Sequence, residues 1–344
     1  MSLPARGGAL VAALLLALPG TAAAALPEPT DRCRIDDARL DELSGLASDG
    51  RSWFAVNDSG SRLEVYVLDP ADCSVRDVRK AAADPRDVED LALGGDGTLW
   101  LADIGDNGRD RDDVVLHAIS PNGKAKLYRL TYPNGPHDAE ALLLDRSGVP
   151  YIVTKEPFGP AGVYRPAGEL SQDQSVPLER VASVSLRSTR TPGGPLSGTL
   201  GSVLVTGGAV SHDGTAVAIR TYTEAYLFHA PDGDVAAALN GEPVQIPLPN
   251  EPQGEALAWE PDGTLLSATE GEGQPVRALA GAAEAATGAV ATSTSNPSPQ
   301  GGDTAEALPP PPKGEGFSNS QLLIVGIVVA GLVVYVSRRA RRNR

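Results

Sequence analysis

A short pattern that recurs along the chain limits its fold more than any other feature of the sequence. In each copy, a small or acidic residue precedes an apolar patch, a glycine turn follows, and a short strand ends in polar residues. The copies begin at Ser44, Glu89, Glu140, Thr206 and Glu255, and their turns lie at Gly50, Gly97, Gly148, Gly214 and Gly263. The intervals between turns, about 50 residues on average, leave room for about four short strands each.

Repeated four-stranded sheets of this length are typical of a β-propeller. We therefore predict an all-β fold, a β-propeller of five blades within residues 26–280, with six blades as the alternative count. An irregular β-sandwich is the alternative fold. The second copy illustrates the expected blade, with strands predicted at residues 88–93, 98–102, 114–119 and 126–132. The last copy runs out of chain before its fourth strand, so residues 33–40 are predicted to supply that strand and close the ring.

The two ends of the chain predict its compartment. Residues 1–25 read as a cleaved signal peptide, because a basic residue, a ten-residue apolar run and small residues follow one another there. Residues 317–337 carry no charge, and as a helix they would cross the membrane. Arginines in residues 338–344 predict a basic cytoplasmic tail. The alternatives are an uncleaved N-terminal anchor and a buried C-terminal helix.

The segment at residues 281–316 is rich in Ala, Pro, Ser, Thr and Gly, which predicts a disordered stalk between the domain and the membrane. The expected location is therefore the cell membrane, with one membrane span and the propeller outside the cell. Cys33 and Cys73 are the only cysteines, and in an exported domain they are predicted to form a disulfide bond. Two free buried thiols are the alternative.

The charge balance excludes one class of partner. The chain has 29 Lys and Arg residues against 44 Asp and Glu residues, a formal net charge of −15. Nucleic acids need basic surfaces, so no nucleic-acid partner is expected. A domain of this composition instead favours cations.

In a propeller the innermost strands line a central channel, and ligands bind at its mouth. The repeat places four carboxylates near the axis: Glu42, Glu89, Glu140 and Glu255. Polar residues at strand ends are predicted to surround one face: Asn57, Asp58, Asp103, Lys155, Glu156, Arg220 and Glu270. Carboxylates held together must pair, take up protons or coordinate a cation, and oxygen ligands suit Ca²⁺.

The densest candidate metal motif is Asp103-Ile104-Gly105-Asp106-Asn107, and the predicted metal ligands are Asp103, Asp106, Asn107, Glu89, Glu140 and Glu255. The predicted ligand-binding residues are Asn57, Asp58, Lys155, Arg220 and Glu270. Strand capping is the alternative role for the polar residues. Lys155 and Arg220 are anion contacts or charge partners of nearby carboxylates, and His137 is an acid–base group or an ordinary turn residue.

Several of these motifs resemble a group of secreted bacterial propellers related to phytase-like and esterase-like propellers. They are Glu-Ala-Leu at 140 and 255, Asn57-Asp58-Ser59-Gly60, the 103–107 motif and VAIRTY at 217–222, within residues 33–280. The resemblance implies that Asp103, Asp106, Glu140 and Glu255 hold calcium. It also implies that Lys155 and Arg220 contact phosphate.

Two functions follow as hypotheses. The first is a membrane-anchored extracellular propeller that binds a ligand or partner at its acidic channel face, without catalysis. The alternative is a Ca²⁺-dependent phosphoester or ester hydrolase that uses the same face. A purely structural spacer is a third hypothesis. The sequence does not decide between catalysis and binding, and it contains no nucleophile elbow, P-loop or dinucleotide motif.

Overall fold

The computed structural model describes residues 26–196 and 199–288, which all belong to one compact unit. In this part of the chain, twenty strands form five four-stranded antiparallel modules, so the predicted all-β fold is confirmed. Module 1 consists of β2 (Leu43–Ser48), β3 (Trp53–Asn57), β4 (Leu63–Leu68) and β5 (Val75–Ala81). Module 2 consists of β6 (Val88–Leu93), β7 (Leu99–Asp103), β8 (Val114–Ile119) and β9 (Ala125–Thr131).

Modules 3 to 5 repeat this order. Module 3 consists of β10 (Ala139–Leu144), β11 (Pro150–Thr154), β12 (Ala161–Pro166) and β13 (Val176–Val184). Module 4 consists of β14 (Val205–Val210), β15 (Ala216–Thr221), β16 (Glu224–His229) and β17 (Val244–Pro247). Module 5 consists of β18 (Gly254–Trp259), β19 (Leu265–Thr269), β20 (Gln274–Leu279) and β1 (Thr30–Ile35). The short helices are η1 (Ala38–Leu40), η2 (Leu200–Ser202), α1 (Val235–Leu239) and α2 (Ala282–Ala286).

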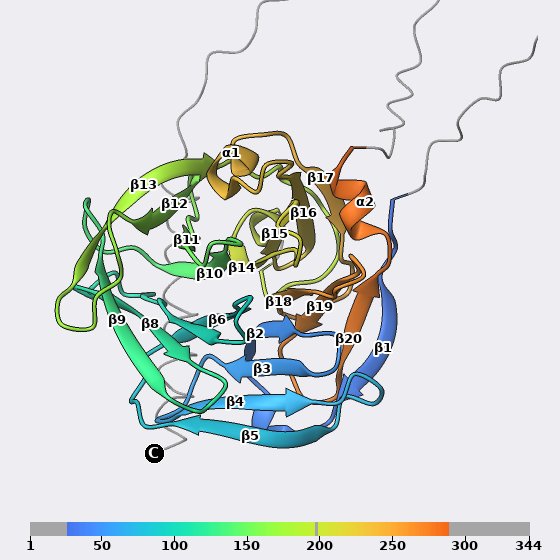
Figure 1. The fold of residues 1–344 in the computed structure, drawn as a ribbon. Coiled ribbons are helices and arrows are strands. Elements are labelled where there is room, and N and C mark those ends of the chain that lie inside the picture. Colours follow the sequence, from blue (N-terminus) through green and yellow to red (C-terminus); the bar gives the residue numbers. More distant parts are fainter. Residues whose placement is uncertain (1–25, 197–198, 289–344) are drawn as a thin grey trace, which may run out of the picture. The chain divides into compact units, whose positions relative to one another are not determined.

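The first strands of the five modules form a closed ring. β2 packs against β6, β6 against β10, β10 against β14, β14 against β18, and β18 against β2. Figure 1 shows these strands around the middle of the fold, with β5, β9 and β13 at its periphery. The outer strands β9 and β13 also pair over two residues in parallel, which joins modules 2 and 3 into one eight-stranded sheet. This topology is consistent with a β-propeller.

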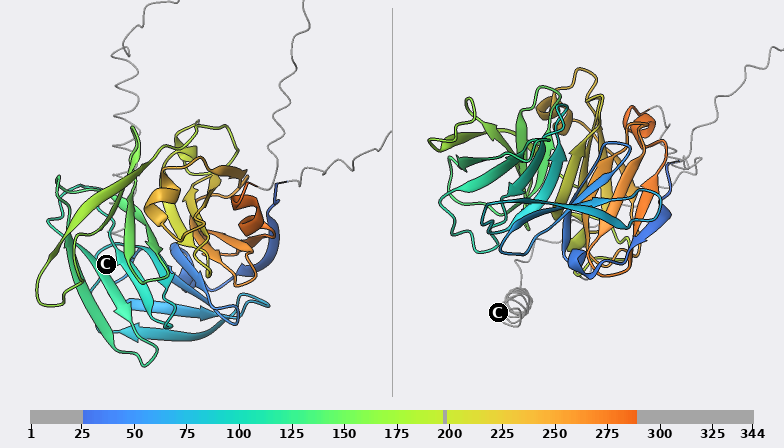
Figure 2. Two further views of the ribbon diagram at one scale, coloured as in Figure 1. Left: turned by 45° about the horizontal axis from the view of Figure 1, so that its top comes forward. Right: turned by 60° about the horizontal axis from the view of Figure 1, so that its bottom comes forward.

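The ring closes through the N-terminal strand. β1 pairs antiparallel with β20 and so becomes the fourth strand of module 5, as the sequence predicted. Figure 2 shows this first strand in blue beside the last, orange strands. The predicted disulfide between Cys33 and Cys73 is confirmed, and it ties β1 to the turn between β4 and β5. The closing strand is therefore held by backbone pairing on one side and by a covalent bond on the other.

Each inner strand begins with the same irregularity. The register with the second strand shifts by one residue at Ser44, Glu89, Glu140, Thr206 and Glu255. These bulges fall where the repeat begins, and the five glycine turns that follow all have left-handed backbones, as the repeat required. One correction follows for module 1. Ser44 holds the position equivalent to Glu89, whereas Glu42 lies two residues earlier, before β2 begins.

A single carboxylate fills the middle of the ring. Asp90 follows the bulge of β6, where the other inner strands carry glycine or alanine, and it is fully buried. Its Oδ2 atom accepts the N–H groups of Leu142 in β10, at 2.8 Å, and of Gly208 in β14, at 3.2 Å. Burial raises the pKa of Asp90 well above its ordinary value, although these N–H groups act in the opposite direction. Asp90 thus links three inner strands across the axis.

Several predicted segments lie outside the described residues, namely the signal peptide at 1–25, the membrane span at 317–337 and the tail at 338–344. Among the residues that are described, no helix has the length and apolar character needed to cross a membrane. The predicted domain boundary at 280 falls just before α2. That helix buries Ala282, Ala285 and Ala286 in the core formed with modules 4 and 5, so the compact part extends into the segment predicted as stalk.

Candidate functional site

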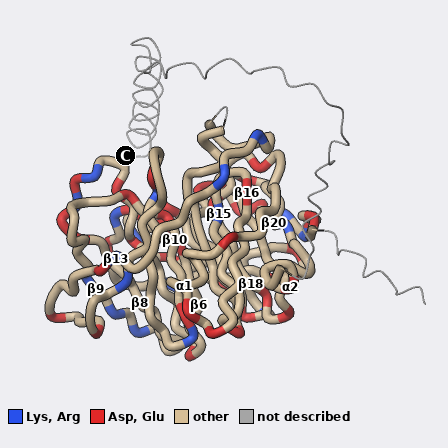
Figure 3. Tube along the Cα trace, turned by 90° about the horizontal axis from the view of Figure 1, so that it is seen from above, with Lys and Arg blue, Asp and Glu red and all other residues tan. Residues whose placement is uncertain are grey.

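Eight carboxylates gather at one end of the channel. They lie just before the inner strands, at the bulges, or just after the second strands, and antiparallel pairing brings these positions to the same end of each module. We call this set the acidic mouth: Glu42, Asp58, Asp87, Glu89, Asp138, Glu140, Glu255 and Glu270. Figure 3 shows Asp and Glu distributed over the ring together with Lys and Arg, so the surface as a whole is mixed. Four carboxylates of the mouth are buried, namely Glu89, Asp138, Glu140 and Glu255, and the other four are half-buried.

Asp87 and Glu89 present their carboxylates side by side. A Cβ atom added to Gly105 would lie 2.4 Å from Oδ2 of Asp87 and 2.2 Å from Oε1 of Glu89, so both oxygens face the same point. The backbone that carries Asp87 is fixed, because Oδ1 of Asp103 accepts its N–H group at 3.1 Å. Burial first, and then Asp138, raise the pKa of Asp87 to about 6. Gly105 leaves the space in which these two carboxylates meet.

Glu89 and Glu255 are buried carboxylates without a hydrogen-bond donor among the described residues. They are only 7% and 5% exposed. Burial, and then the charge of Glu140, raise the pKa of both groups well above its ordinary value. A buried carboxylate in this setting stays protonated or needs a cation.

Lys155 places an ammonium group among these carboxylates. Its Nζ atom donates to Oε1 of Glu140 at 2.6 Å and to the hydroxyl of Tyr222 at 2.9 Å, and it lies over the ring of Tyr222. Burial would lower the pKa of Lys155, but Glu140, Tyr222 and Glu255 outweigh it, so the amine stays charged. Burial also raises the pKa of Glu140 to about 7, against the effect of Lys155. The ammonium of Lys155 therefore offsets negative charge at Glu140 and at Glu255.

The predicted calcium motif at 103–107 uses its carboxylates within module 2. Asp103 is buried, and its oxygens contact the guanidinium of Arg111 at 2.9 Å and the ring of His117 at 3.5 Å. Burial opposes the ionisation of Asp103, but His117, Arg111 and backbone N–H groups lower its pKa below the ordinary value. Asp106 accepts the N–H groups of Asp110 and Arg111.

These contacts leave a different role for each member of the motif. Asn107 is exposed. The N–H group of Asp106 donates to Oδ1 of Asp138, which connects the motif to the acidic mouth. The motif therefore supports the mouth through Gly105 and through its backbone, while its own carboxylates bind protein donors.

The predicted ligand-binding residues have different surroundings. Arg220 is fully buried between modules 4 and 5, where its guanidinium binds Glu251 and the hydroxyl of Ser267. Lys155, Asp58 and Glu270 belong to the mouth. Asn57 lies beside Asp58, and its Nδ2 atom donates to the carbonyl of Arg39 at 2.6 Å.

Sequence reasoning missed Asp87, Asp138 and Tyr222. The first two carried a signal, because an acidic residue stands two positions before the bulge in Asp87-Val88-Glu89 and in Asp138-Ala139-Glu140. Residues two apart in a strand share a face, so this spacing brings paired carboxylates together. Tyr222 had no such signal, since its contact with Lys155 joins modules 3 and 4.

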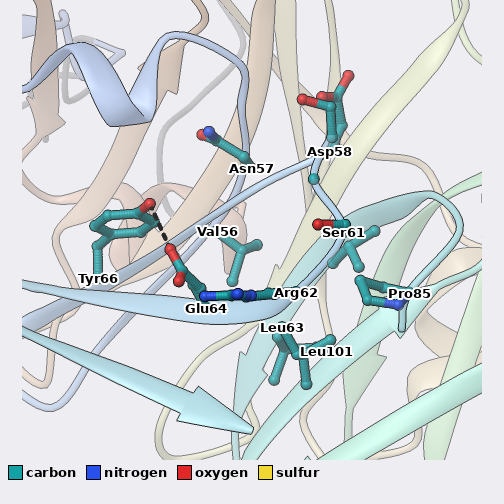
Figure 4. Close-up of a pocket in the computed structure, with 13 residues that line it drawn as sticks. Val56, Asn57, Asp58, Ser61, Arg62, Leu63, Glu64, Tyr66, Pro85 and Leu101 are labelled. Carbon is teal, nitrogen blue, oxygen red and sulfur yellow. Dashed lines mark hydrogen bonds between the residues drawn. The ribbon is translucent and has the colours of Figure 1, made fainter. Parts of the chain in front are cut away.

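A cavity of about 250 Å³ opens next to the mouth, between modules 1 and 2. Figure 4 shows the residues that line it, including Asn57, Asp58, Arg62 and Glu64. Within residues 26–196 and 199–288, no three His, Cys, Asp or Glu side chains form a group that could hold a metal ion. Any ion at the mouth would therefore take part of its oxygen ligands from water or from a bound molecule.

Comparisons with known proteins give no family. No family model and no curated protein matches the chain. A luciferin-regenerating enzyme matches at 12% identity and a TM-score of 0.43, over 73% of this chain and 95% of its own. A gluconolactonase from Xanthomonas campestris matches at 14% and 0.39, over 76% of this chain and 99% of its own. The PQQ-bound aldose sugar dehydrogenase from Streptomyces coelicolor matches at 11% and 0.40, over 74% of this chain and 99% of its own. Matches at this level assign no activity to the chain.

Proposed function

We propose that the chain is a membrane-tethered extracellular propeller of five blades that binds Ca²⁺ at its acidic mouth and, through it, a ligand or partner. The observation that carries the proposal is the burial of Glu89 and Glu255 without hydrogen-bond donors from the described residues. A hard cation would supply the missing interaction, and Ca²⁺ accepts carboxylate and water oxygens in flexible numbers.

Asp87 and Glu89 are the residues best placed to hold the ion. Their oxygens both lie against Gly105, where a Cβ atom would displace them, so the two carboxylates are close enough to share one ion. Asp58 is close enough to repel both groups. Beyond the effect of burial, its charge raises the pKa of Glu89, and the charge of Asp87 raises the pKa of Asp58. The remaining ligands would be water or oxygen atoms of the bound molecule, which is how a cation at the mouth would select its partner.

Replacing Glu89 with glutamine is expected to weaken Ca²⁺ binding at least tenfold, because one of the two adjacent carboxylates becomes a neutral amide. Calorimetric titration of the purified full-length protein with CaCl₂ measures the effect. Gly105→Ala is expected to weaken binding as well, since its Cβ would meet both oxygens. Glu169→Gln, at an exposed site away from the mouth, serves as the matched control.

The proposal fails if the unmodified protein gives no Ca²⁺ binding heat and no rise in melting temperature with Ca²⁺. Equal Ca²⁺ affinity in the Glu89→Gln variant would instead show that the ion binds at a place other than Asp87 and Glu89.

A second candidate function is a Ca²⁺-dependent phosphoester or ester hydrolase. The observation that favours it is the contact of Glu140, whose pKa is about 7, with Lys155 beside the cation-binding carboxylates. A group with such a pKa suits proton transfer near neutral pH. Phosphomonoester and ester panels, with Ca²⁺ or chelator, separate the two functions. Turnover that is lost in the Glu140→Gln variant would support the hydrolase. The absence of turnover on both panels would contradict the hydrolase and leave ligand binding as the remaining function.

The tether rests on the uncharged stretch at 317–337 and the arginines that follow it. Removing residues 317–344 is expected to release the protein from the membrane fraction into the medium. Retention of the shortened chain in the membrane fraction would contradict this part of the proposal.

A further inference from the structure

The channel has a second cavity at the end away from the acidic mouth. The inner strands run from the mouth toward this end, and the last residue of each lines the cavity: Ser48, Leu93, Leu144, Val210 and Trp259. All five modules therefore contribute to it. Its volume is about 500 Å³, which is twice that of the cavity beside Asp58 and within the usual range of small-molecule sites, about 300–1,000 Å³.

Asp90 separates this cavity from the mouth. It follows Glu89 of the mouth along β6, and the next residue, Leu91, already lines the cavity. Gly208, whose N–H group donates to Asp90, lines it as well. The cavity and the proposed Ca²⁺ site therefore lie on opposite sides of one buried carboxylate.

Small residues leave this space open. Eight of the twenty residues that line the cavity are glycine or alanine. Gly95 is an example, because a Cβ atom added to it would meet no other atom within 4 Å. The space therefore follows from the residue types that the sequence places at the ends of the inner strands and in the turns after them.

Part of the wall is both apolar and accessible. Ala92 and Leu93 of β6 and Ala209 and Val210 of β14 are half-buried, and each also packs against one of the hydrophobic cores between neighbouring modules. A hydrocarbon body in the cavity would cover part of their remaining surface. Such burial of apolar surface favours binding.

The buried hydroxyl groups of the wall already have partners. The hydroxyl of Ser48 donates to Glu260 at 2.8 Å, and the hydroxyl of Ser211 donates to Asp213 at 2.7 Å. An apolar body can therefore cover this part of the wall without leaving either hydroxyl unpaired.

The rim of the cavity holds charges of both signs. Asp49 and Asp145 line it, and each accepts N–H groups of its own turn. Arg146 also lines it, with its stem against Gly214, where an added Cβ atom would lie 2.5 Å from Cδ of Arg146. The carboxylates oppose an anion and the guanidinium opposes a cation. Since any ion would also lose hydration on entering, this rim favours an uncharged ligand.

We propose that this cavity binds a small uncharged molecule, with its hydrocarbon body against Leu93 and Val210 and its polar end at the rim. The site goes beyond the proposed Ca²⁺ function and does not depend on it. Binding is therefore measured in the presence of a chelator, so that failure of one proposal leaves the other open to test.

Three probes with nearly the same body test the choice of charge: cyclohexylmethanol, cyclohexanecarboxylate and cyclohexylmethylammonium. Calorimetric titration of the full-length protein near neutral pH is expected to show the alcohol binding at least about fivefold more tightly than either ion. An ion that binds as tightly as the alcohol would overturn the choice of an uncharged ligand. The absence of alcohol binding would overturn the proposal altogether.

Gly95→Trp tests the place of binding. Gly95 is exposed, lines the cavity and has open space around an added Cβ atom, so the indole can occupy the cavity without displacing a neighbour. This variant is expected to lose alcohol binding and to keep the urea midpoint of the unmodified protein.

Gly168→Trp is the matched control. Gly168 is likewise exposed with open space around an added Cβ atom, but it does not line the cavity. It is expected to bind the alcohol as the unmodified protein does. Unchanged alcohol binding in Gly95→Trp, or an equal loss in both variants, would overturn the choice of this cavity.

Discussion

Replacing Arg220 with alanine is expected to lower the free energy of unfolding by about 3–5 kcal/mol, the cost of breaking a buried ion pair. Arg220 is fully buried. Its guanidinium binds Glu251 and, at 2.5 Å, the hydroxyl of Ser267. Without Arg220, the buried Glu251 keeps only Ser267 and a longer contact with Arg277, at 3.6 Å. Urea unfolding of the full-length protein measures the loss.

Two comparisons make this result specific to the buried pair. Arg165→Ala breaks a half-exposed pair with Glu179 and is expected to cost less than about 1 kcal/mol. The double replacement Arg220→Met with Glu251→Leu removes both charges and is expected to recover much of the loss. A loss below about 1 kcal/mol for Arg220→Ala would show that modules 4 and 5 do not depend on this pair.

Removing the disulfide, by Cys33→Ser with Cys73→Ser, is expected to lower the free energy of unfolding by about 4 kcal/mol. The bond joins residues 40 positions apart, and a loop of that length loses about this much conformational free energy in the unfolded chain when it is closed. Urea unfolding again measures the change. Amide hydrogen exchange should show the fastest new opening in β1, because the disulfide holds that strand.

Reduction provides an independent check on the disulfide. The unmodified protein in reducing agent should match the double serine variant in its urea midpoint. If the serine variant is as stable as the oxidised protein, backbone pairing with β20 alone suffices to hold β1.

The repeat allowed most of the fold to be predicted, because in each copy a glycine turn follows the start of the repeat at a similar spacing. That turn lies between the first and the second strand of the module. In module 2 the predicted strands agree with β6 and β8 and differ by one residue at the ends of β7 and β9. The closing strand was predicted too late in the chain. It ends at Ile35, because Asp37 then caps the turn of η1 by accepting the N–H group of Arg39.

The candidate site was less predictable, because the partner of a charged side chain is set by tertiary structure. Asp103 and Glu89 look alike as acidic strand residues. Yet Asp103 binds Arg111, eight positions along, whereas Glu89 has no donor among the described residues. The same limit applies to Arg220, whose burial depends on Glu251, 31 positions away. Local spacing shows which end of a module a residue occupies, and long-range contacts decide what it does there.

The closing strand also sets an order of events during synthesis. β1 is made first, but its partner strand follows late, since the contact of Thr30 with Ala278 spans 248 positions. Its cysteine partner arrives much sooner, 40 positions later. In an oxidising compartment the disulfide would therefore form while most of the ring is still unmade. It would keep the first strand beside module 1 until β20 is made, and so protect its free edge from pairing with other chains before the ring closes.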